Sequence, residues 1–114
     1  MPIPPYSAVR GNDTIAFISG QLPLDETGRI PKDIESQTRV ALTNLEQALH
    51  TAGMTVDDVV KTTLFVTDIT QLPTVNKAYV EFFSTPYPAR SAVQVTALAQ
   101  GAGIEIEAVA LRAH

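Results

Sequence analysis

The chain has 114 residues, no cysteine and a formal net charge of −4 at pH 7. This length predicts one domain spanning residues 1–114, and the absence of cysteine excludes disulfides and thiolate chemistry. Lys and Arg are scattered singly, which argues against a nucleic-acid partner, and no apolar stretch is long enough to span a membrane. We therefore expect a cytoplasmic protein.

The N-terminal part of the chain predicts a hairpin. The proline-rich segment at residues 1–5 shows no signal-peptide pattern and is expected to be extended, because each proline disfavours helix at the residue before it. Residues 8–10 and 14–19 favour strands on either side of the turn signal Gly-Asn-Asp at residues 11–13.

A long helix and a buried strand follow the hairpin. Apolar residues recur at three- and four-residue steps over residues 33–52, which predicts an amphipathic helix. Asp33 is its expected N-cap, and Gly53 suits the left-handed conformation just past its end. Residues 59–67 are rich in β-branched side chains, which favours a strand buried on both faces.

The C-terminal part adds a second helix and two strands. Residues 72–83 favour a helix with proline in its first turn, and residues 90–98 and 104–111 favour strands joined by a flexible turn at residues 100–103. The order β-β-α-β-α-β-β predicts an α+β fold in which one mixed sheet carries both helices on one face. The other face would be bare in a single chain, so we expect subunits to pack against it.

Arg90 is the first candidate for chemistry. It follows Pro88-Ala89 at the start of a predicted strand. A guanidinium there could bind a carboxylate through two parallel hydrogen bonds. The alternative is a surface arginine at a strand end, which is the commoner environment for a charged residue.

Glu105 and Glu107 are the second candidates. Strand alternation places both carboxylates on one face and Ile104 and Ile106 on the other. A carboxyl held near apolar surface has a raised pKa, which suits general acid or base catalysis. The alternative is a solvent-facing edge strand with ordinary charges.

Three further segments could contribute to a binding site. Ser19-Gly20-Gln21 ends a predicted strand, and Gly20 there would let backbone approach a ligand closely. Tyr6 lies in a proline-fixed segment and could present its hydroxyl or simply pack. Asn76 lies within the second predicted helix, where an asparagine is usually exposed.

Metal-dependent and nucleophilic chemistry are not predicted. His50 and His114 are far apart, and no spacing of acidic residues around them suggests a metal site. Ser19 has no histidine partner at a suggestive spacing. No nucleotide-binding pattern is present, so we expect no cofactor.

Segments spread over nearly the whole chain, in the same order, resemble the RidA (YjgF-type) family. The Pro-Ala-Arg-Ser element followed by Ile-Glu-Ile-Glu-Ala is specific, whereas Ser-Gly-Gln alone would be a weak match. The matching segments are Pro5 to Ser7, Ser19 to Pro23, Gln37-Thr38 through Asn44-Leu45, Asp58 to Thr63, Val75-Asn76, Tyr79, Phe82-Phe83, Pro88 to Ser91 and Ile104 to Ala108.

The resemblance implies a chorismate-mutase-like (YjgF-like) fold and a homotrimer whose sheets form a central barrel. It also implies clefts between subunits that hydrolyse the reactive enamine or imine acids 2-iminopropanoate and 2-iminobutanoate to 2-oxo acids and ammonia. In this resemblance, Arg90 matches the arginine that binds the substrate carboxylate, and Glu105 matches the glutamate that holds the reacting water. The residues implied to line the cleft are Tyr6, Ser19, Gly20 and Asn76.

The sequence departs from the family pattern in four places. Ala92 stands where many members have cysteine, which argues against a thiol role. Pro4 replaces a common glycine, and Ala99-Gln100 replace a common Pro-Lys pair. The segment Ser84 to Tyr87 is shorter than usual, and we expect it to border the cleft and affect substrate preference.

Other functions remain open at this point. A different enamine acid, such as 2-aminomuconate, would keep the enzyme class and change the substrate. A non-enzymatic ligand-binding or regulatory role, including translation inhibition, is a second possibility, although the presence of both Arg90 and Glu105 argues against a dead site. An endoribonuclease is a third possibility, which the acidic composition disfavours.

Overall fold

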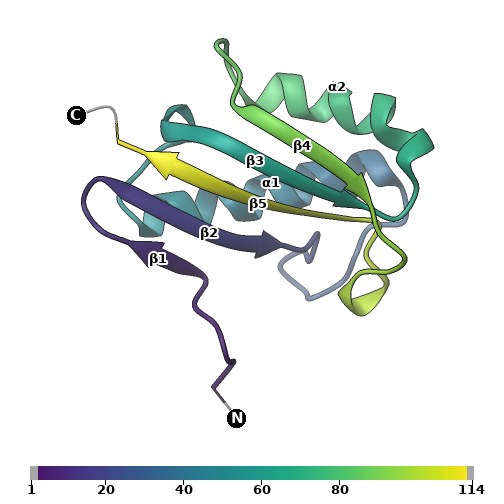
Figure 1. Cartoon of the computed structure of the whole chain (residues 1–114). Coiled ribbons are helices and arrows are strands. Elements are labelled where there is room, and N and C mark those ends of the chain that lie inside the picture. Colours follow the sequence, from purple (N-terminus) through teal and green to yellow (C-terminus); the bar gives the residue numbers. More distant parts are fainter. Residues whose placement is uncertain (1–2, 113–114) are drawn as a thin grey trace.

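The computed structural model describes residues 3–112, which form five strands and two α-helices in the predicted order (Figure 1). His114 and the first two residues of the proline-rich segment lie outside the described residues. The strands are β1 (Val9–Gly11), β2 (Ile15–Gln21), β3 (Val59–Val66), β4 (Ala89–Gln94) and β5 (Ile104–Leu111). The helices are α1 (Ile34–Thr51) and α2 (Leu72–Phe82), and the short 3-10 turns η1 (Val56–Asp58), η2 (Ile69–Gln71) and η3 (Ala99–Gly101) were not predicted.

The five strands form one mixed sheet in the order β1-β2-β5-β3-β4. Strands β3 and β4 pair in parallel through the crossover helix α2, whereas the other neighbours are antiparallel. Both helices cover the same face of the sheet (Figure 1). The predicted α+β architecture is confirmed. Strand β5 lies in the middle of the sheet, so the alternative that placed Glu105 and Glu107 on an edge strand is wrong.

The core lies between the sheet and the two helices. Every second residue of β5, beginning at Ile104, is buried against the helices, and Leu42, Leu45 and Leu49 of α1 face them. The prediction that residues 59–67 are buried on both faces is wrong. Buried and partly exposed residues alternate along most of β3, because no layer formed by residues 3–112 covers the second face of the sheet.

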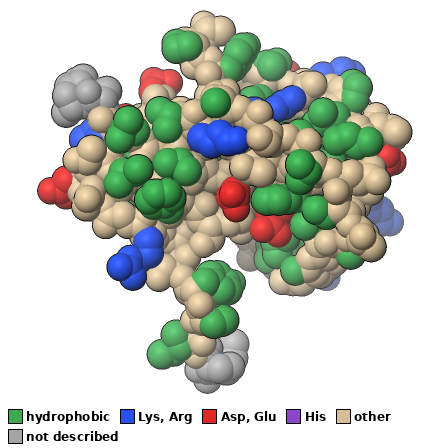
Figure 2. Space-filling model, in the orientation of Figure 1, with side chains coloured by type: hydrophobic (Ala, Val, Ile, Leu, Met, Phe, Trp, Pro, Cys, Tyr) green, Lys and Arg blue, Asp and Glu red, His purple; other side chains and the backbone are tan. Residues whose placement is uncertain are grey.

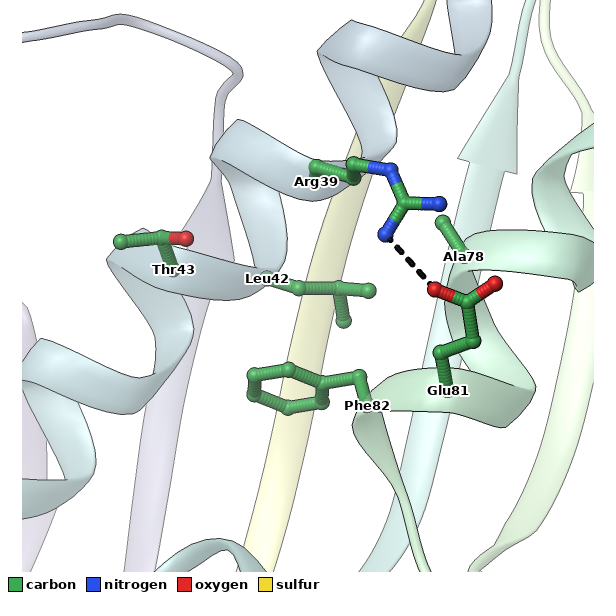
Figure 3. A pocket seen from close by; sticks show the side chains of 6 residues that line it. All are labelled: Arg39, Leu42, Thr43, Ala78, Glu81 and Phe82. Atoms are coloured by element: carbon green, nitrogen blue, oxygen red, sulfur yellow. Dashed lines mark hydrogen bonds and ion pairs between the residues drawn. The ribbon is translucent and has the colours of Figure 1, made fainter.

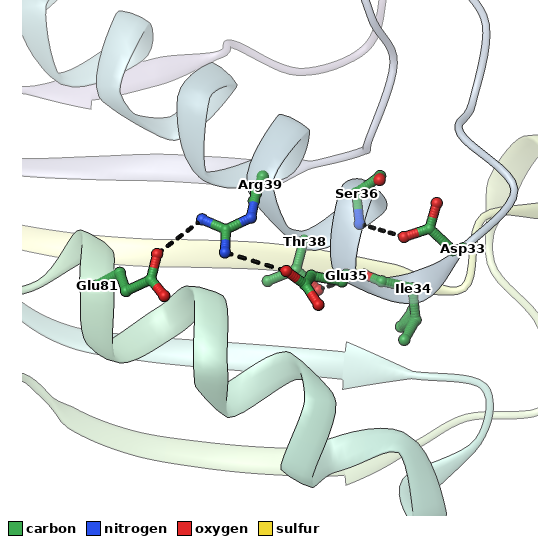
Figure 4. A network of polar contacts seen from close by, with 7 residues as sticks. All are labelled: Asp33, Ile34, Glu35, Ser36, Thr38, Arg39 and Glu81. Atoms are coloured by element: carbon green, nitrogen blue, oxygen red, sulfur yellow. Dashed lines mark hydrogen bonds and ion pairs between the residues drawn. The ribbon is translucent and has the colours of Figure 1, made fainter.

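Helix α1 begins and ends as predicted. The Asp33 carboxylate accepts a hydrogen bond of 2.8 Å from the Ser36 amide, which satisfies one free donor of the first turn (Figure 4). Gly53, just past the helix, has a φ of +74°, a left-handed conformation that glycine adopts without strain. The Arg39 guanidinium bridges Glu35 and Glu81 at 3.1 Å each and so links α1 to α2. Both ion pairs are exposed, so they contribute little to the stability of the folded chain.

Strand β4 is shorter than the predicted strand over residues 90–98. It pairs only with β3, and the last register partners are Val66 and Gln94. Just beyond them the Val95 amide still donates a 2.8 Å hydrogen bond to the Val66 carbonyl, and the Gln94 side chain accepts a 2.9 Å hydrogen bond from the Ile69 amide. The chain then turns through Gln100, whose φ is +59°.

The second face of the sheet is open, as predicted, and carries apolar side chains from four strands. Phe17, Val93 and Leu111, from three different strands, are between 42% and 53% exposed there, and Phe65 and Val109 are partly buried beside them. Figure 2 shows hydrophobic side chains gathered in two areas of this open face, with a few charged side chains between them. Within residues 3–112, no helix is long and apolar enough to cross a membrane.

Candidate functional site

Arg90 is held on the helix-covered side of the edge strand β4. It is the register partner of the buried Thr62, and register partners on parallel strands point to the same side of the sheet. Its guanidinium donates a 2.8 Å hydrogen bond to the amide oxygen of Asn76 on α2. The same guanidinium lies 4.8 Å from the centre of the Tyr79 ring, within cation–π range. Arg90 is therefore a fixed, partly buried cation.

Tyr79 lies against the Arg90 guanidinium and is itself held by Thr62, and the residue pattern did not identify this role. Their hydroxyl oxygens are 2.7 Å apart, and both residues are buried. Burial raises the pKa of Tyr79, and the bond to Thr62 and the Arg90 charge offset this only in part. Tyr79 lies within the helix predicted over residues 72–83 and contributes to the family resemblance, which gives it no role in the cleft. No local signal reveals its contact with Arg90, because that contact depends on the parallel pairing of β3 and β4.

Glu105 lies on the open face of the sheet, against the backbone of Gly20 on β2. A side chain at position 20 would overlap the Glu105 carboxylate, so the close approach requires glycine. Glu105 is the register partner of Phe65, whose aromatic ring is also on this face. Burial raises the pKa of the Glu105 carboxyl, and the neighbouring Glu107 carboxylate raises it further. A carboxyl in this setting suits proton transfer at neutral pH better than an ordinary one.

Ser19 and Tyr6 lie next to Gly20 in different ways. The Ser19 hydroxyl donates to the Ser7 carbonyl, and the Ser19 amide donates a 2.9 Å hydrogen bond to the Ala8 carbonyl. Ser19, which the family resemblance places in the cleft, therefore fastens the N-terminal segment to β2, and its hydroxyl hydrogen is occupied by the bond to Ser7. Tyr6 is 68% exposed, so its ring projects from the surface of this chain.

Five of the six predicted site residues form two groups on opposite faces of one sheet, and the sixth, Tyr6, lies in the segment before β1. Arg90 and Asn76 lie on the side of the helices. Glu105 and Gly20 lie together on the open side, with Ser19 next to them on β2. A substrate molecule cannot reach through the sheet, so one chain does not bring Arg90 and Glu105 together.

Other parts of the described chain offer no better site. Among residues 3–112, no three His, Asp or Glu side chains are grouped so that they could hold a metal ion. A shallow groove of 330 Å³ lies between α1 and α2, over Leu42 and Phe82. Its two charged residues, Arg39 and Glu81, are already paired with each other (Figure 3).

Two of the departures from the family pattern lie close to Arg90. Ala92, two residues along β4, packs against the core on the same side of the sheet. Residues 84–86 of the shortened loop line a 260 Å³ hollow together with Phe83 and the turn η1. Pro88, two residues before Arg90, also lines this hollow.

Comparison with known proteins gives close matches over nearly the whole chain. A sequence profile of the family described as Endoribonuclease L-PSP matches residues 1–112. The chain is 42% identical over 116 residues to the 2-iminobutanoate/2-iminopropanoate deaminase of Escherichia coli K12, covering 96% of this chain and 89% of that protein.

Solved structures agree with these sequence matches. The crystal structure of E. coli TdcF with bound serine has a TM-score of 0.91 at 37% identity, covering 98% of this chain and 91% of that chain. RidA from an Antarctic Psychrobacter has a TM-score of 0.92 at 34% identity, covering 98% and 92%. This chain therefore has the same fold as these two proteins along almost its full length.

Proposed function

Because this chain belongs to the RidA/YjgF/endoribonuclease L-PSP family, we propose that it deaminates small 2-imino acids in the cytoplasm. The proposed substrates are 2-iminopropanoate and 2-iminobutanoate, which water converts to 2-oxo acids and ammonia. The observation that carries the proposal is the 42% identity, over nearly the whole chain, to a deaminase of these two compounds. The bound serine in TdcF supports a ligand of the size and charge of a small amino acid.

In the proposed reaction, Arg90 binds the substrate carboxylate. Its guanidinium is already oriented by Asn76 and the Tyr79 ring, so little conformational freedom is lost when a carboxylate binds. Positioning an electrophilic imine next to a water molecule supplies much of the rate, without a metal or a covalent nucleophile.

Glu105 is the proposed proton-transfer group. A water oxygen adds to the carbon of the protonated imine while Glu105 accepts one of the water protons, which gives a carbinolamine. Glu105 then returns that proton to the amino nitrogen. As the carbon–nitrogen bond breaks and ammonia leaves, the carbon–oxygen double bond forms and Glu105 accepts the remaining hydroxyl proton. The raised pKa of Glu105 brings its two protonation states closer in free energy at neutral pH, which favours this shuttle.

The separation of Arg90 from Glu105 supports a site built by two copies of the chain. We propose a homotrimer in which Arg90 and Asn76 of one copy meet Glu105, Gly20 and the Tyr6 segment of its neighbour. The open apolar face supports this assembly, because an uncovered face of this kind is typical of a subunit interface.

The test is ammonia release from 2-iminopropanoate generated in place by a dehydratase, with and without the purified chain. We expect a clear acceleration over spontaneous hydrolysis. A panel that includes 2-aminomuconate decides between enamine acids: faster turnover of that compound would move the proposal to the alternative substrate. No acceleration with any member of the panel would contradict the enzymatic function.

A further inference from the structure

Helix α1 carries two amide side chains that reach out of the helix to the backbone of other segments. They are Gln37, which is 8% exposed, and Asn44, which is partly buried. The two residues are seven positions apart, which is close to two helical turns and places them on one face of α1. That pattern suggests one structural task shared by both amides.

Gln37 holds the segment that leads into β5. The Gly103 amide donates a 2.8 Å hydrogen bond to the side-chain oxygen of Gln37, and the side-chain nitrogen donates a 2.9 Å bond to the Pro31 carbonyl. Gly103 precedes Glu105 by two residues. Gln37 therefore fixes the point from which the Glu105 side chain projects.

Asn44 holds the segment that leaves β2. Its side-chain nitrogen donates hydrogen bonds of 3.0 Å to the carbonyls of both Leu22 and Leu24. Leu22 follows Gly20 by two residues. The two amides of α1 thus secure the two backbone segments next to the point where Glu105 meets Gly20.

The sheet alone does not fix that meeting point. The pairing of β2 with β5 changes register between Ile18 and Gln21, so the ladder is interrupted at Gly20. Within this irregular stretch, the Gln21 side chain donates a 2.9 Å bond to the Ser19 carbonyl. Where a ladder is interrupted, side-chain hydrogen bonds to backbone must supply the missing constraint.

We propose that Gln37 and Asn44 are positioning residues that set the distance between the Glu105 carboxylate and the Gly20 backbone. They touch neither substrate nor reacting atoms, and they act by holding Gly103 and Leu22 in place. The expected loss of turnover in variants of Gln37 and Asn44 rests on the proposed function. The expected change in the surroundings of the Glu105 carboxylate rests only on the hydrogen bonds of Gln37 and Asn44.

The test compares Gln37→Leu with Thr38→Val. Thr38 is the neighbouring residue, is fully buried, and donates a 2.7 Å bond only within its own helix, to the Ile34 carbonyl. Both changes remove buried side-chain hydrogen bonds from α1, so both should lower Tm, but only Gln37→Leu releases Gly103. With 2-iminopropanoate from a dehydratase, we expect Gln37→Leu to lower kcat about tenfold while KM stays within about twofold, because a small displacement of a reacting group has effects of this size or larger.

Two more variants complete the comparison. Gln37→Glu keeps the oxygen that accepts from Gly103 but loses the donor to the Pro31 carbonyl, so it should recover part of the lost kcat. Asn44→Asp keeps the shape but lacks both donors, and should lower kcat as Gln37→Leu does. A Gln37→Leu enzyme that matches Thr38→Val in kcat, or a Gln37→Glu enzyme as slow as Gln37→Leu, overturns the proposal.

A second readout separates this inference from the deaminase proposal. Carbon NMR of the Glu105 carboxyl, followed over pH, reports its environment without any substrate. We expect its titration midpoint to move in Gln37→Leu and to stay unchanged in Thr38→Val, since Glu107 and Lys61, the charged residues of β5 and β3 on this face, are the same in both. If wild type is inactive but the midpoint moves, only the proposed function fails. An unmoved midpoint in Gln37→Leu contradicts the positioning role.

Discussion

Arg90 and Glu105 are held in place by different kinds of contact. Arg90 lies on an edge strand and is oriented by side chains of α2, through the Asn76 oxygen at 2.8 Å and the Tyr79 ring. Glu105 lies on the central strand, pressed against the Gly20 backbone on the open face. Directional contacts suit a group that must recognise a planar carboxylate, whereas a poorly solvated setting suits a group that must exchange protons.

The position of the two residues is as informative as their surroundings. A single sheet separates them, so each chain presents one half of the proposed site on each face. In the proposed arrangement, assembly is part of catalysis and not only of stability. Variants of Glu105 and Arg90 test the two halves separately, and we expect the larger effect from Glu105.

Glu105→Gln should have the largest effect on turnover. The change keeps the shape of the side chain but removes proton transfer, so kcat should fall by roughly 10²–10⁴ with KM nearly unchanged. The assay is steady-state hydrolysis of 2-iminopropanoate made by a dehydratase. A folded Glu105→Gln enzyme with full activity would show that this carboxyl is not the proton-transfer group.

Arg90→Lys should weaken the other half of the site. A lysine keeps the charge but loses the two parallel hydrogen bonds, so kcat/KM should fall at least about tenfold. Arg39→Lys is the matched control, because Arg39 makes exposed ion pairs on the outer surface of the helices. Equal activities of the two variants would mean that Arg90 is an ordinary surface arginine.

Gly20→Ala tests the close approach on the Glu105 side. The added methyl group would overlap the carboxylate and displace it, so kcat should fall by up to about 10²-fold. In an enzyme that already carries Glu105→Gln, Gly20→Ala should lower kcat much less, because the side chain that it displaces can no longer transfer a proton. Independent, additive losses would argue that Gly20 acts on something other than Glu105.

The pH dependence of stability gives the smallest expected effect. Burial, and then Glu107, raise the pKa of Glu105 in the folded chain, so the folded state binds this proton more tightly than the unfolded state does. The resulting stability is fully present in acid, below the unfolded pKa, and is lost as pH rises through the folded pKa. Glu105→Gln should therefore melt like wild type in acid and at a higher temperature near neutral pH. A variant that melts lower at neutral pH would indicate a structural role for Glu105.

Local patterns in the sequence were sufficient for the elements and their order. Three- and four-residue spacing predicted α1, and Asp33 and Gly53 marked its ends. Two-residue alternation placed Glu105 opposite Ile104 and Ile106. These features depend on neighbours within a few residues, which is why a single sequence reveals them.

Features that depend on pairing between distant segments could not be predicted from residue patterns. The central position of β5 is set by its pairing with both β2 and β3, and an acidic strand read alone resembles an edge strand. The stacking of Arg90 on Tyr79 requires β4 to lie parallel to β3 beneath α2. The resemblance to a family, and not the residue pattern, gathered Arg90 and Glu105 into one hypothesis.

Mixing two inactive variants tests the central claim most directly. Chains carrying Arg90→Ala and chains carrying Glu105→Gln are unfolded together in equal amounts, refolded, and assayed with 2-iminopropanoate, with sedimentation to confirm a trimer. If each site takes Arg90 from one copy and Glu105 from its neighbour, random assembly should restore about a quarter of the wild-type sites. Mixed chains no more active than either parent, or a stable monomer that is fully active, would contradict a site built between copies.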